Sequence, residues 1–359
     1  MSIVALDILL AFALALALVW LLVPVAIRLR LEDRPDERKT HHGHIPLIGG
    51  IVIYLTLVLC MLLIPWLQLD RQTASFLVAG GVLVIAGAVD DRSGLDVRLR
   101  ILVEAAAASI LIFGGQVWIG NLGNLFGLGE IHMPFWIAYP FTLVAVFGIL
   151  NAFNMIDGMD GLAGGISLAV IAILLLVTDI SPGLDTLGPL LVGALLAYLI
   201  CNLKLLPWLP KIFLGDAGSK LIGLALVWFL IASARSGSQG QGGIAPATAL
   251  FLVGLPLFDM VATTIRRGRR GVSPFAPDRT HIHHLLLAAG YSRSTVMGMV
   301  LGCALALNLT GVALSLAEVA EVRQFAAFFA LYLLYSQLTG KVLDRIDRAR
   351  QHPVTAGRS

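Results

Sequence analysis

The chain alternates between long apolar runs and short polar connections along almost its whole length. Eleven of these runs are apolar enough to predict helices that cross a lipid bilayer, a crossing that takes about 20 residues. Their approximate bounds are 3–27, 47–67, 73–89, 101–116, 135–153, 162–178, 187–203, 212–234, 245–265, 294–315 and 323–340. The pattern predicts an all-α polytopic membrane protein.

The composition supports a chain that lies mostly in the membrane. Of its 359 residues, 58% are hydrophobic and only 13% are charged, whereas a soluble domain carries about 25% charged residues. This excludes a soluble domain with a single anchor. We expect one transmembrane catalytic domain over residues 1–345 and a short basic cytoplasmic tail over residues 346–359. The three cysteines lie far apart in apolar runs, which indicates packing residues and not a disulfide or metal site.

Lysine and arginine are distributed unevenly between alternate connections. All but three of the 25 (Arg71, Arg235 and Arg323) lie in the connections 28–46, 90–100, 204–220 and 266–293 and in the tail 341–359. The positive-inside rule predicts that these segments are cytoplasmic. The N-terminus is then outside and the C-terminus cytoplasmic, with the first run retained as a helix because it lacks a preceding basic segment.

Five carboxylates lie in or beside the predicted cytoplasmic connections. They are Asp90 and Asp91 in AVDDR, Asp157 and Asp160 in NMIDGMDG, and Asp216 in FLGDAGSK. Each has a structural alternative, namely a solvated acidic loop for the first pair and helix caps for Asp157 and Asp216. Together they would repel one another unless a divalent cation held them, and Mg²⁺ is the oxygen-seeking ion that bridges carboxylates and phosphates.

Basic side chains complement these carboxylates on the same predicted face. The segment DRTHIHHLL contains His281, His283 and His284 beside Arg279 and four further arginines, and Lys39 and His41 lie in the first connection. This spacing is poor for zinc, so we interpret the cluster as a phosphate site. The alternative is that the arginines only fix the membrane topology and contact anionic lipid. Together the motifs predict phosphoryl transfer at the bilayer surface.

Two more carboxylates, Glu104 and Asp259, fall inside predicted membrane runs. Ionisable residues within a membrane are functional candidates by default. Both lie close to the predicted cytoplasmic edge, so we expect Glu104 to pair with Arg100 and Asp259 to pair with Arg266.

Four segments, AVDDR, NAFNMIDGMDGLAGG, FLGDAGS and SPFAPDRTHIHHL, resemble the signature segments of the polyprenyl-phosphate N-acetylhexosamine-1-phosphate transferases, glycosyltransferase family 4. The resemblance extends from DRPDERKTHHGHIPLIGG to HIHHLLLAAGYS, in the same order and with the same eleven-span layout. It is strongest to the bacterial branch that transfers GlcNAc-1-phosphate to undecaprenyl phosphate. It implies that the phosphate of undecaprenyl phosphate attacks the sugar-proximal phosphate of a UDP-N-acetylhexosamine and that UMP leaves.

The resemblance also implies residue roles. Asp90 would assist deprotonation of the lipid phosphate with Asp91 beside it, and Asp216, with Asp91, would hold Mg²⁺ or, as an open alternative, Mn²⁺. The resemblance implies that a further set of residues forms the site for the nucleotide sugar and its diphosphate. These are Asp157, Asp160, Asn154, Gly158, Asn202, Phe213, His281, His283, His284, Lys39, His41 and Arg279.

The resemblance leaves several alternatives open. HIHH, with Arg98 and Arg100 after the acidic pair, favours UDP-GlcNAc over the UDP-muramoyl-pentapeptide of the cell-wall branch, which is the second choice. GalNAc, a covalent aspartyl intermediate and a homodimer stay open. A secondary transporter would place its ionisable residues near the membrane midplane, whereas this chain gathers its charges at one face, which disfavours a transporter. The implied location is the bacterial inner membrane, where the product starts a lipid-linked surface polysaccharide such as O antigen. We expect contact with membrane lipid and no nucleic-acid partner.

Overall fold

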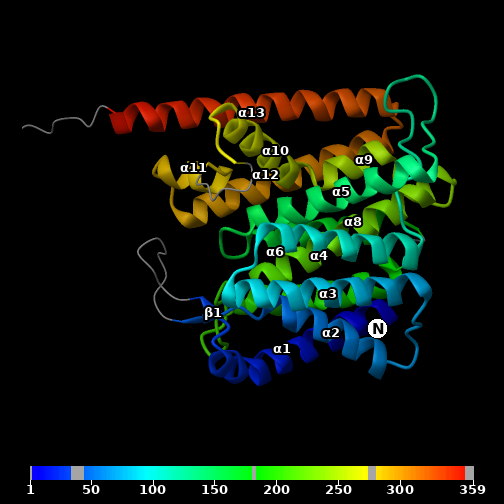
Figure 1. The fold of residues 1–359 in the computed structure, drawn as a ribbon. Coiled ribbons are helices and arrows are strands. Elements are labelled where there is room, and N and C mark those ends of the chain that lie inside the picture. Colours follow the sequence, from blue (N-terminus) through cyan, green and yellow to red (C-terminus); the bar gives the residue numbers. More distant parts are fainter. Residues whose placement is uncertain (1, 34–43, 180–182, 274–279, 352–359) are drawn as a thin grey trace, which may run out of the picture.

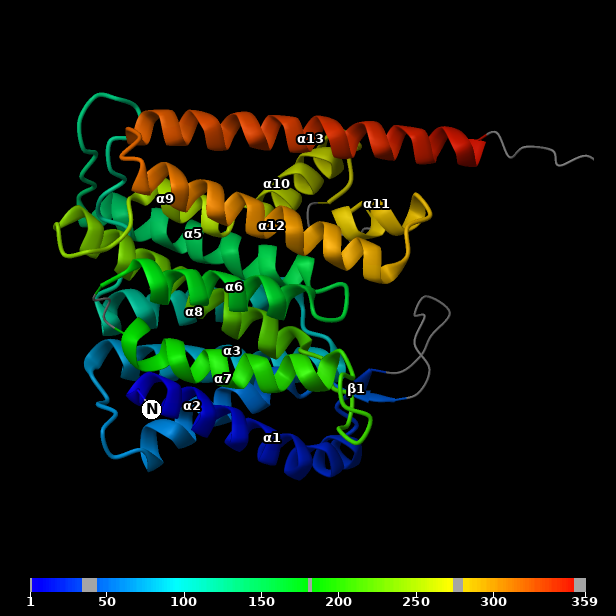
Figure 2. The same cartoon turned by 180° about the vertical axis from the view of Figure 1, so that it is seen from behind.

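The computed structural model describes residues 2–33, 44–179, 183–273 and 280–351. Most of its long helices lie side by side along one common direction, with α1 at one edge of the bundle and α13 at the other, while α10 runs obliquely to them (Figures 1 and 2). In chain order the helices are α1 (Ile3–Leu29), α2 (Gly49–Leu63), α3 (Arg71–Ser93), α4 (Val97–Ser109), η1 (Ile110–Gly114), α5 (Phe135–Ile156), α6 (Leu162–Val177), α7 (Leu184–Asn202), α8 (Gly215–Ser238), α9 (Pro246–Leu252), α10 (Gly254–Arg269), α11 (Ile282–Ala288), α12 (Arg293–Leu316) and α13 (Glu321–Gln351).

Each apolar run of the sequence holds a helix or a pair of consecutive helices. Seven helices in the described part of the chain are long and apolar enough to cross a membrane, or eight when α9 and α10 are taken as one bent span. The shorter helices α2 and α6 are apolar as well. The predicted multi-pass helical membrane architecture is therefore confirmed, while the count of eleven spans stays a prediction.

The run 245–265 was expected to form one straight span, and it is broken instead. α9 and α10 meet at Val253 with a bend of 75°. Pro256 follows the break, and proline cannot donate the backbone hydrogen bond that a continuous helix needs there. Oriented by its hydrogen-bond network, the Asn308 amide of α12 donates to the carbonyls of Phe251 and Leu252 at 3.1 and 3.0 Å. The side chain thereby satisfies carbonyl groups that the break leaves without helical partners.

A small antiparallel ladder departs from the all-α expectation. β1 (Glu32–Asp33) pairs with β2 (Ile45–Pro46) at the base of the first predicted cytoplasmic connection. The Phe213 backbone N–H donates to the carbonyl of Pro46, and the Gly49 N–H donates to the carbonyl of Phe213, both at 2.9 Å. These bonds attach the base of the first connection to the segment that leads into α8.

Helix α8 lies at the centre of the bundle. In an apolar stretch of 18 residues, 94% of α8 is buried, whereas 11% of the corresponding stretch of α13 is buried. Two glycines on neighbouring helices allow this close packing at the start of α8. A Cβ on Gly50 of α2 would lie 2.2 Å from the backbone nitrogen of Gly218, and one on Gly87 of α3 would lie 2.4 Å from the Cα of Ala217. The first turn of α8, which carries Asp216, is therefore held between α2 and α3.

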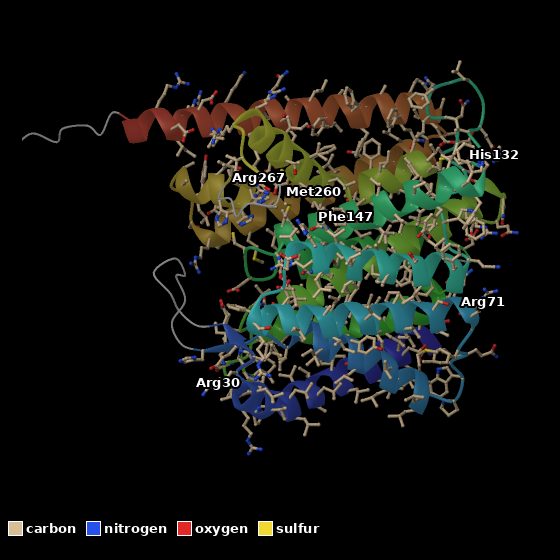
Figure 3. The ribbon with its side chains drawn as sticks, in the orientation of Figure 1. Arg30, Arg71, His132, Phe147, Met260 and Arg267 are labelled. Carbon is tan, nitrogen blue, oxygen red and sulfur yellow. The ribbon has the colours of Figure 1, made fainter. Side chains whose placement is uncertain are left out.

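The two sets of connections lie at opposite ends of the bundle. Figure 3 shows Arg71 and His132 at one end, with Arg30 and Arg267 displaced toward the other. α1, α3, α5 and α7 end at the same end at which α8 begins, and the carboxylates of the sequence motifs occupy these termini. The end that carries Arg30 is the one we predicted to be cytoplasmic.

Candidate active site

The carboxylates that the sequence places in three separate connections come together in the structure. The backbone N–H of Asp216, in the first turn of α8, donates to Asp91 Oδ1 at the end of α3 at 2.9 Å. Burial, together with the neighbouring carboxylates of Asp216, Asp91 and Asp160, raises the pKa of Asp157 well above its usual range. The prediction that these motifs share one site agrees with this geometry.

Asp91 and Asp216 form the centre of the cluster. Asp91 also accepts from the backbone N–H of Ala217 at 3.4 Å, so its carboxylate covers the exposed N–H groups at the start of α8. Asp216 does not cap its own helix; instead its Oδ1 accepts from Asn154 Nδ2 at 2.9 Å, and the same amide contacts Ser219 Oγ at 3.0 Å. The helix-cap alternative for Asp216 is therefore wrong.

Asp90 is not part of a solvated acidic loop. Its side chain is 3% exposed, and its Oδ2 lies 2.8 Å from Arg100 Nε and 3.8 Å from Lys220 Nζ. Its Oδ1 accepts from the backbone N–H of Leu95 at 2.8 Å. Both oxygens of Asp90 thus already have partners within the protein, two of them the cations of Arg100 and Lys220.

Lys220 is a site residue that the sequence analysis did not identify. Its Nζ lies 3.4 Å from Glu104 Oε1, while Asn151 Nδ2 donates to Glu104 Oε2 at 3.0 Å. The expected pairing of Glu104 with Arg100 is wrong, since Arg100 contacts Asp90 instead. Lys220 follows Asp216 by four residues on α8, and the i, i+4 spacing places both on the side of the helix that faces the acidic residues. That spacing to Asp216 is the feature of the sequence from which Lys220 could have been predicted as a site residue.

The turn between α5 and α6 carries Asp157, Gly158 and Asp160. Asp157 does not cap α6, because the cap position is Gly161, whose N–H donates to Asn202 Oδ1 at 2.6 Å. Asn202 is 2% exposed and also donates to the carbonyl of Ile212 at 2.9 Å. Asn202, predicted to bind substrate, braces the turn against the segment before α8.

Lys211 connects the same segment to the acidic turn. Its ammonium pairs with Asp160 Oδ2 and lies 5.3 Å from the centre of the Phe213 ring. The contact places an aromatic face and a cation next to Asp160. Sequence analysis predicted Asp160 and Phe213 as site residues but assigned no role to Lys211.

The histidine motif approaches the acidic turn from α11. His283 is 1% exposed, and a Cβ on Gly158 would lie 2.2 Å from its Nε2. Neither ring nitrogen of His283 has a hydrogen-bond partner among the residues that the structure describes. Burial, with the neighbouring His284 ring adding to it, lowers the pKa of His283 to about 3. This imidazole is therefore neutral at pH 7 and has two polar atoms that the protein leaves unsatisfied.

His281 has different surroundings from His283. It lies in a buried network with Asp259, at 2.7 Å from Nδ1, and with Arg267, at 3.4 Å from Nε2. The expected pairing of Asp259 with Arg266 is wrong, because Arg266 donates to Thr263, Thr280 and Thr339. Lys39, His41 and Arg279 lie outside the described residues.

The donor set is compatible with Mg²⁺. Within the part of the chain that the structure describes, no group of three or more acidic, histidine or cysteine side chains is arranged to hold a metal. Mg²⁺ is usually bound through one or two carboxylates, water and substrate phosphates. Asp216 and Asp91, whose carboxylate accepts from the Asp216 backbone N–H, supply that number of carboxylates.

An apolar cavity of about 790 Å³ lies along the same helices. It is lined by α5, α8, α9 and α10, including Val144 and Met260, and by the connection between η1 and α5, including Gly120 and His132. Arg235, near the α8 C-terminus, also lies on its wall, so much of the cavity lies toward the end of the bundle opposite the acidic residues. Gly148 of α5 also lines it, one turn before Asn151. Figure 3 shows Met260 and Phe147 between the two ends of the bundle. The cavity suits a long hydrocarbon ligand.

Known proteins resemble this chain over most of its length. The model of glycosyl transferase family 4 matches residues 73–234. Undecaprenyl-phosphate alpha-N-acetylglucosaminyl 1-phosphate transferase of Escherichia coli O157:H7 is 38% identical over 315 residues, covering 87% of this chain and 84% of that protein. The same enzyme of strain K12 is 37% identical (89% and 86% covered), and that of Haemophilus influenzae is 36% identical (87% of each chain). The chain therefore belongs to the glycosyl transferase family 4 enzymes, alongside these transferases.

Proposed function

We propose that this protein transfers GlcNAc-1-phosphate from UDP-GlcNAc to undecaprenyl phosphate and releases UMP. The observation that carries the proposal is the convergence of Asp91, Asp157 and Asp216 at the predicted cytoplasmic ends of α5 and α8, two helices that also line the apolar cavity. The relatives named above act on undecaprenyl phosphate, which gives the acceptor its identity. A phosphate-handling site beside a hydrocarbon site is what such an acceptor requires.

The proposed reaction is a direct displacement at phosphorus. An oxygen of the acceptor phosphate forms a bond to the sugar-linked phosphorus of the donor. The bond from that phosphorus to the bridging oxygen breaks, and UMP leaves with the bridging oxygen and its electron pair. Because the acceptor phosphate is already anionic, the step needs little help from a base. In this proposal Asp90 holds Arg100 and Lys220 in place.

The nucleotide sugar binds beside the acidic turn and α11, which contact each other through Gly158 and His283. The two unsatisfied nitrogens of His283 are available to a sugar hydroxyl or a phosphate oxygen, and one of them carries a proton to donate. Since the ring is neutral, it contributes a hydrogen bond and not a positive charge. Lys211 and Phe213 supply a cation and an aromatic face on the opposite side of Asp160.

Mg²⁺ held by Asp91 and Asp216 would supply positive charge to the diphosphate when bound. Asn154 orients Asp216 through its 2.9 Å hydrogen bond, and the backbone at the start of α8 orients Asp91. Burial is the main cause of the raised pKa of Asp157, and the neighbouring carboxylates of Asp216, Asp91 and Asp160 add to it.

The acceptor chain occupies the apolar cavity, with its phosphate at the end near Asn151. The arginine-rich end of the bundle is cytoplasmic by the positive-inside rule, so the site opens to the compartment that contains nucleotide sugars. The membrane is the bacterial inner membrane. In this proposal residues 1–345 form a single catalytic domain, and residues 346–359 form a basic tail.

The test is UMP release by the purified protein with undecaprenyl phosphate and Mg²⁺, with UDP-GlcNAc, UDP-GalNAc and UDP-muramoyl-pentapeptide supplied separately. We expect release with UDP-GlcNAc and none without the acceptor. Release with the pentapeptide donor alone would overturn the choice of sugar, and acceptor-independent release would overturn the transfer reaction.

A further inference from the structure

Asp259 is a buried carboxylate inside α10 whose partners come from two other helices. It is 1% exposed. Its Oδ2 lies 2.7 Å from His281 Nδ1, and its Oδ1 accepts from the backbone N–H of Ile282 at 2.9 Å and from the Tyr335 hydroxyl at 2.7 Å. Ile282 is the first residue of α11, and Tyr335 belongs to α13. One carboxylate therefore connects α10 and α13 to the start of the helix that carries the histidine motif.

The surroundings of His281 fix which of its nitrogens holds the proton. An arginine side chain can only donate, so His281 Nε2, 3.4 Å from an Arg267 nitrogen, presents its lone pair. The proton then lies on Nδ1 and is donated to Asp259 Oδ2. His281 is 5% exposed, and both of its nitrogens are engaged within the protein. No nitrogen of this ring remains to bind a substrate.

His283 shows the opposite arrangement two residues later. Its ring is stacked parallel to that of His281, with centres 6.1 Å apart and planes within 6°. Both of its nitrogens are unsatisfied, and it contacts Gly158 beside Asp157. The position of the His283 ring thus depends on the position of α11, which Asp259 holds through Ile282 and His281.

We propose that Asp259, held by Tyr335, is a positioning residue that fixes the tautomer of His281 and the start of α11, and thereby places His283 at the nucleotide sugar. In this arrangement His281 anchors the histidine motif and does not contact substrate. The inference rests on the function proposed above, because it assigns the nucleotide sugar to His283. It predicts that changes at Asp259 affect use of the donor through His281 and leave use of the polyprenyl acceptor unchanged.

The kinetic test compares Asp259→Asn, Tyr335→Phe, His281→Ala and the double variant Asp259→Asn/His281→Ala in the full-length protein. We expect Asp259→Asn to lower kcat/KM for UDP-GlcNAc by about 10- to 100-fold, as small misplacements of a binding group do. Tyr335→Phe, which removes one of the three hydrogen bonds, should lower it by about three- to tenfold. The KM for undecaprenyl phosphate should stay within about twofold. The double variant should lose less than the two single variants added together, because part of the effect of Asp259 passes through His281.

Thr248→Val is the matched control. Thr248 Oγ1 forms a buried 3.0 Å hydrogen bond to Gln324 Oε1, so the variant also removes a polar contact between a broken-span helix and α13, but away from α11. If Thr248→Val reduces donor use as much as Tyr335→Phe does, the effect is general loosening of α13 and the proposal is wrong. Additive losses in the double variant, or equal losses for donor and acceptor, would also overturn it.

A spectroscopic measurement tests the network without relying on turnover. In protein labelled with ¹⁵N-histidine, the His281 ring, assigned with His281→Ala, should show the tautomer protonated at Nδ1 in the wild type. It should lose that single-tautomer signature in Asp259→Asn. An unchanged tautomer would contradict the proposal. A wild-type protein that has the tautomer but releases no UMP would instead contradict the proposed function.

Discussion

The imidazole of His283 lies directly against the backbone of Gly158, so that a Cβ at residue 158 would be 2.2 Å from Nε2. The contact joins α11 to the turn that carries Asp157 and Asp160, two segments more than a hundred residues apart in the sequence. Only glycine permits this approach without moving the ring, because the clash would involve a buried side chain. The glycine at 158 is therefore a packing requirement of the proposed donor site.

Gly158→Ala should displace His283 and impair use of the nucleotide sugar. We expect kcat/KM for UDP-GlcNAc to fall by about 100-fold, the effect of a displacement of about 1 Å at a binding group. Gly302→Ala on α12 is the control, since a Cβ there meets nothing within 4 Å. Steady-state kinetics of both variants decide the matter, and equal activity of the two would show that the His283 contact is unimportant.

The low pKa of His283 predicts how its contribution to stability changes with pH. The unfolded ring takes up a proton near its ordinary pKa of 6.5, whereas the folded ring stays neutral down to about 3. The unfolded state thus binds more protons in this window. Stability should fall as the pH drops from 6.5 toward 3, by at most about 1.4 kcal/mol per pH unit. Thermal unfolding at pH 7.5 and 5 should show a larger loss for the wild type than for His283→Gln; identical losses would contradict a neutral folded ring.

Asp216→Asn should abolish most activity while the protein still inserts into the membrane. Losing one of the two proposed Mg²⁺ ligands should lower kcat by about 100- to 1000-fold. Asp347→Asn is a suitable control. Asp347 of α13 is a partly exposed carboxylate that pairs with Arg270 at the end of α10, and such surface pairs contribute little to stability. UMP release by membranes with matched protein levels is the readout, and near-normal turnover of Asp216→Asn would remove this residue from the metal site.

Lys220→Met should destabilise the protein, because it leaves two buried carboxylates without their shared cation. Glu104 and Asp90 are 4% and 3% exposed at their side chains, and breaking a buried ion pair costs about 3–5 kcal/mol. The double variant Lys220→Met/Glu104→Gln should recover part of the loss. Thermal unfolding measures both, with the exposed Lys341→Met as the control. A double variant that is less stable than Lys220→Met would contradict the pairing.

Asn308→Leu should loosen the bend between α9 and α10. The variant removes a donor to the carbonyls of Phe251 and Leu252. The Phe251 carbonyl still accepts from the Val253 backbone N–H, and the loss at the Leu252 carbonyl costs about 1–3 kcal/mol. Since Val253 and Met260 line the apolar cavity, the KM for undecaprenyl phosphate should rise while the KM for UDP-GlcNAc stays constant. Thr310→Val, an exposed change on the same helix, is the control. A rise confined to the donor KM would contradict the link between the bend and the cavity.

Much of the helical architecture could be predicted from the sequence because lipid imposes a strong requirement. Every backbone polar group inside a bilayer must be satisfied, so long apolar runs form helices. The grouping of Asp91, Asp157 and Asp216 could also be predicted, since alternate connections return to the same end of a bundle. The break at Val253 was missed because its stability depends on Asn308, a side chain on another helix.

The partners of the buried charges could not be read from sequence proximity. Arg100 is close to Glu104 in the chain and Arg266 is close to Asp259, but the structure pairs Glu104 with Lys220 and Asp259 with His281. Lys220 lies on α8, far from Glu104 in the sequence, whereas His281 lies 22 residues after Asp259, at the start of the next helix. The division of the histidine motif into an anchored ring and an unsatisfied ring likewise depends on α10 and α13.

The most direct test of the proposed reaction follows the sugar-linked phosphate of the donor. UDP-GlcNAc labelled with ³²P at that phosphate is incubated with the purified protein, undecaprenyl phosphate and Mg²⁺, and the products are partitioned between water and organic solvent. We predict that the label enters the organic phase together with the sugar, in equal amounts, and that the UMP released is unlabelled. Label that stays in the aqueous phase as GlcNAc-1-phosphate or inorganic phosphate would show hydrolysis in place of transfer and contradict the proposed function.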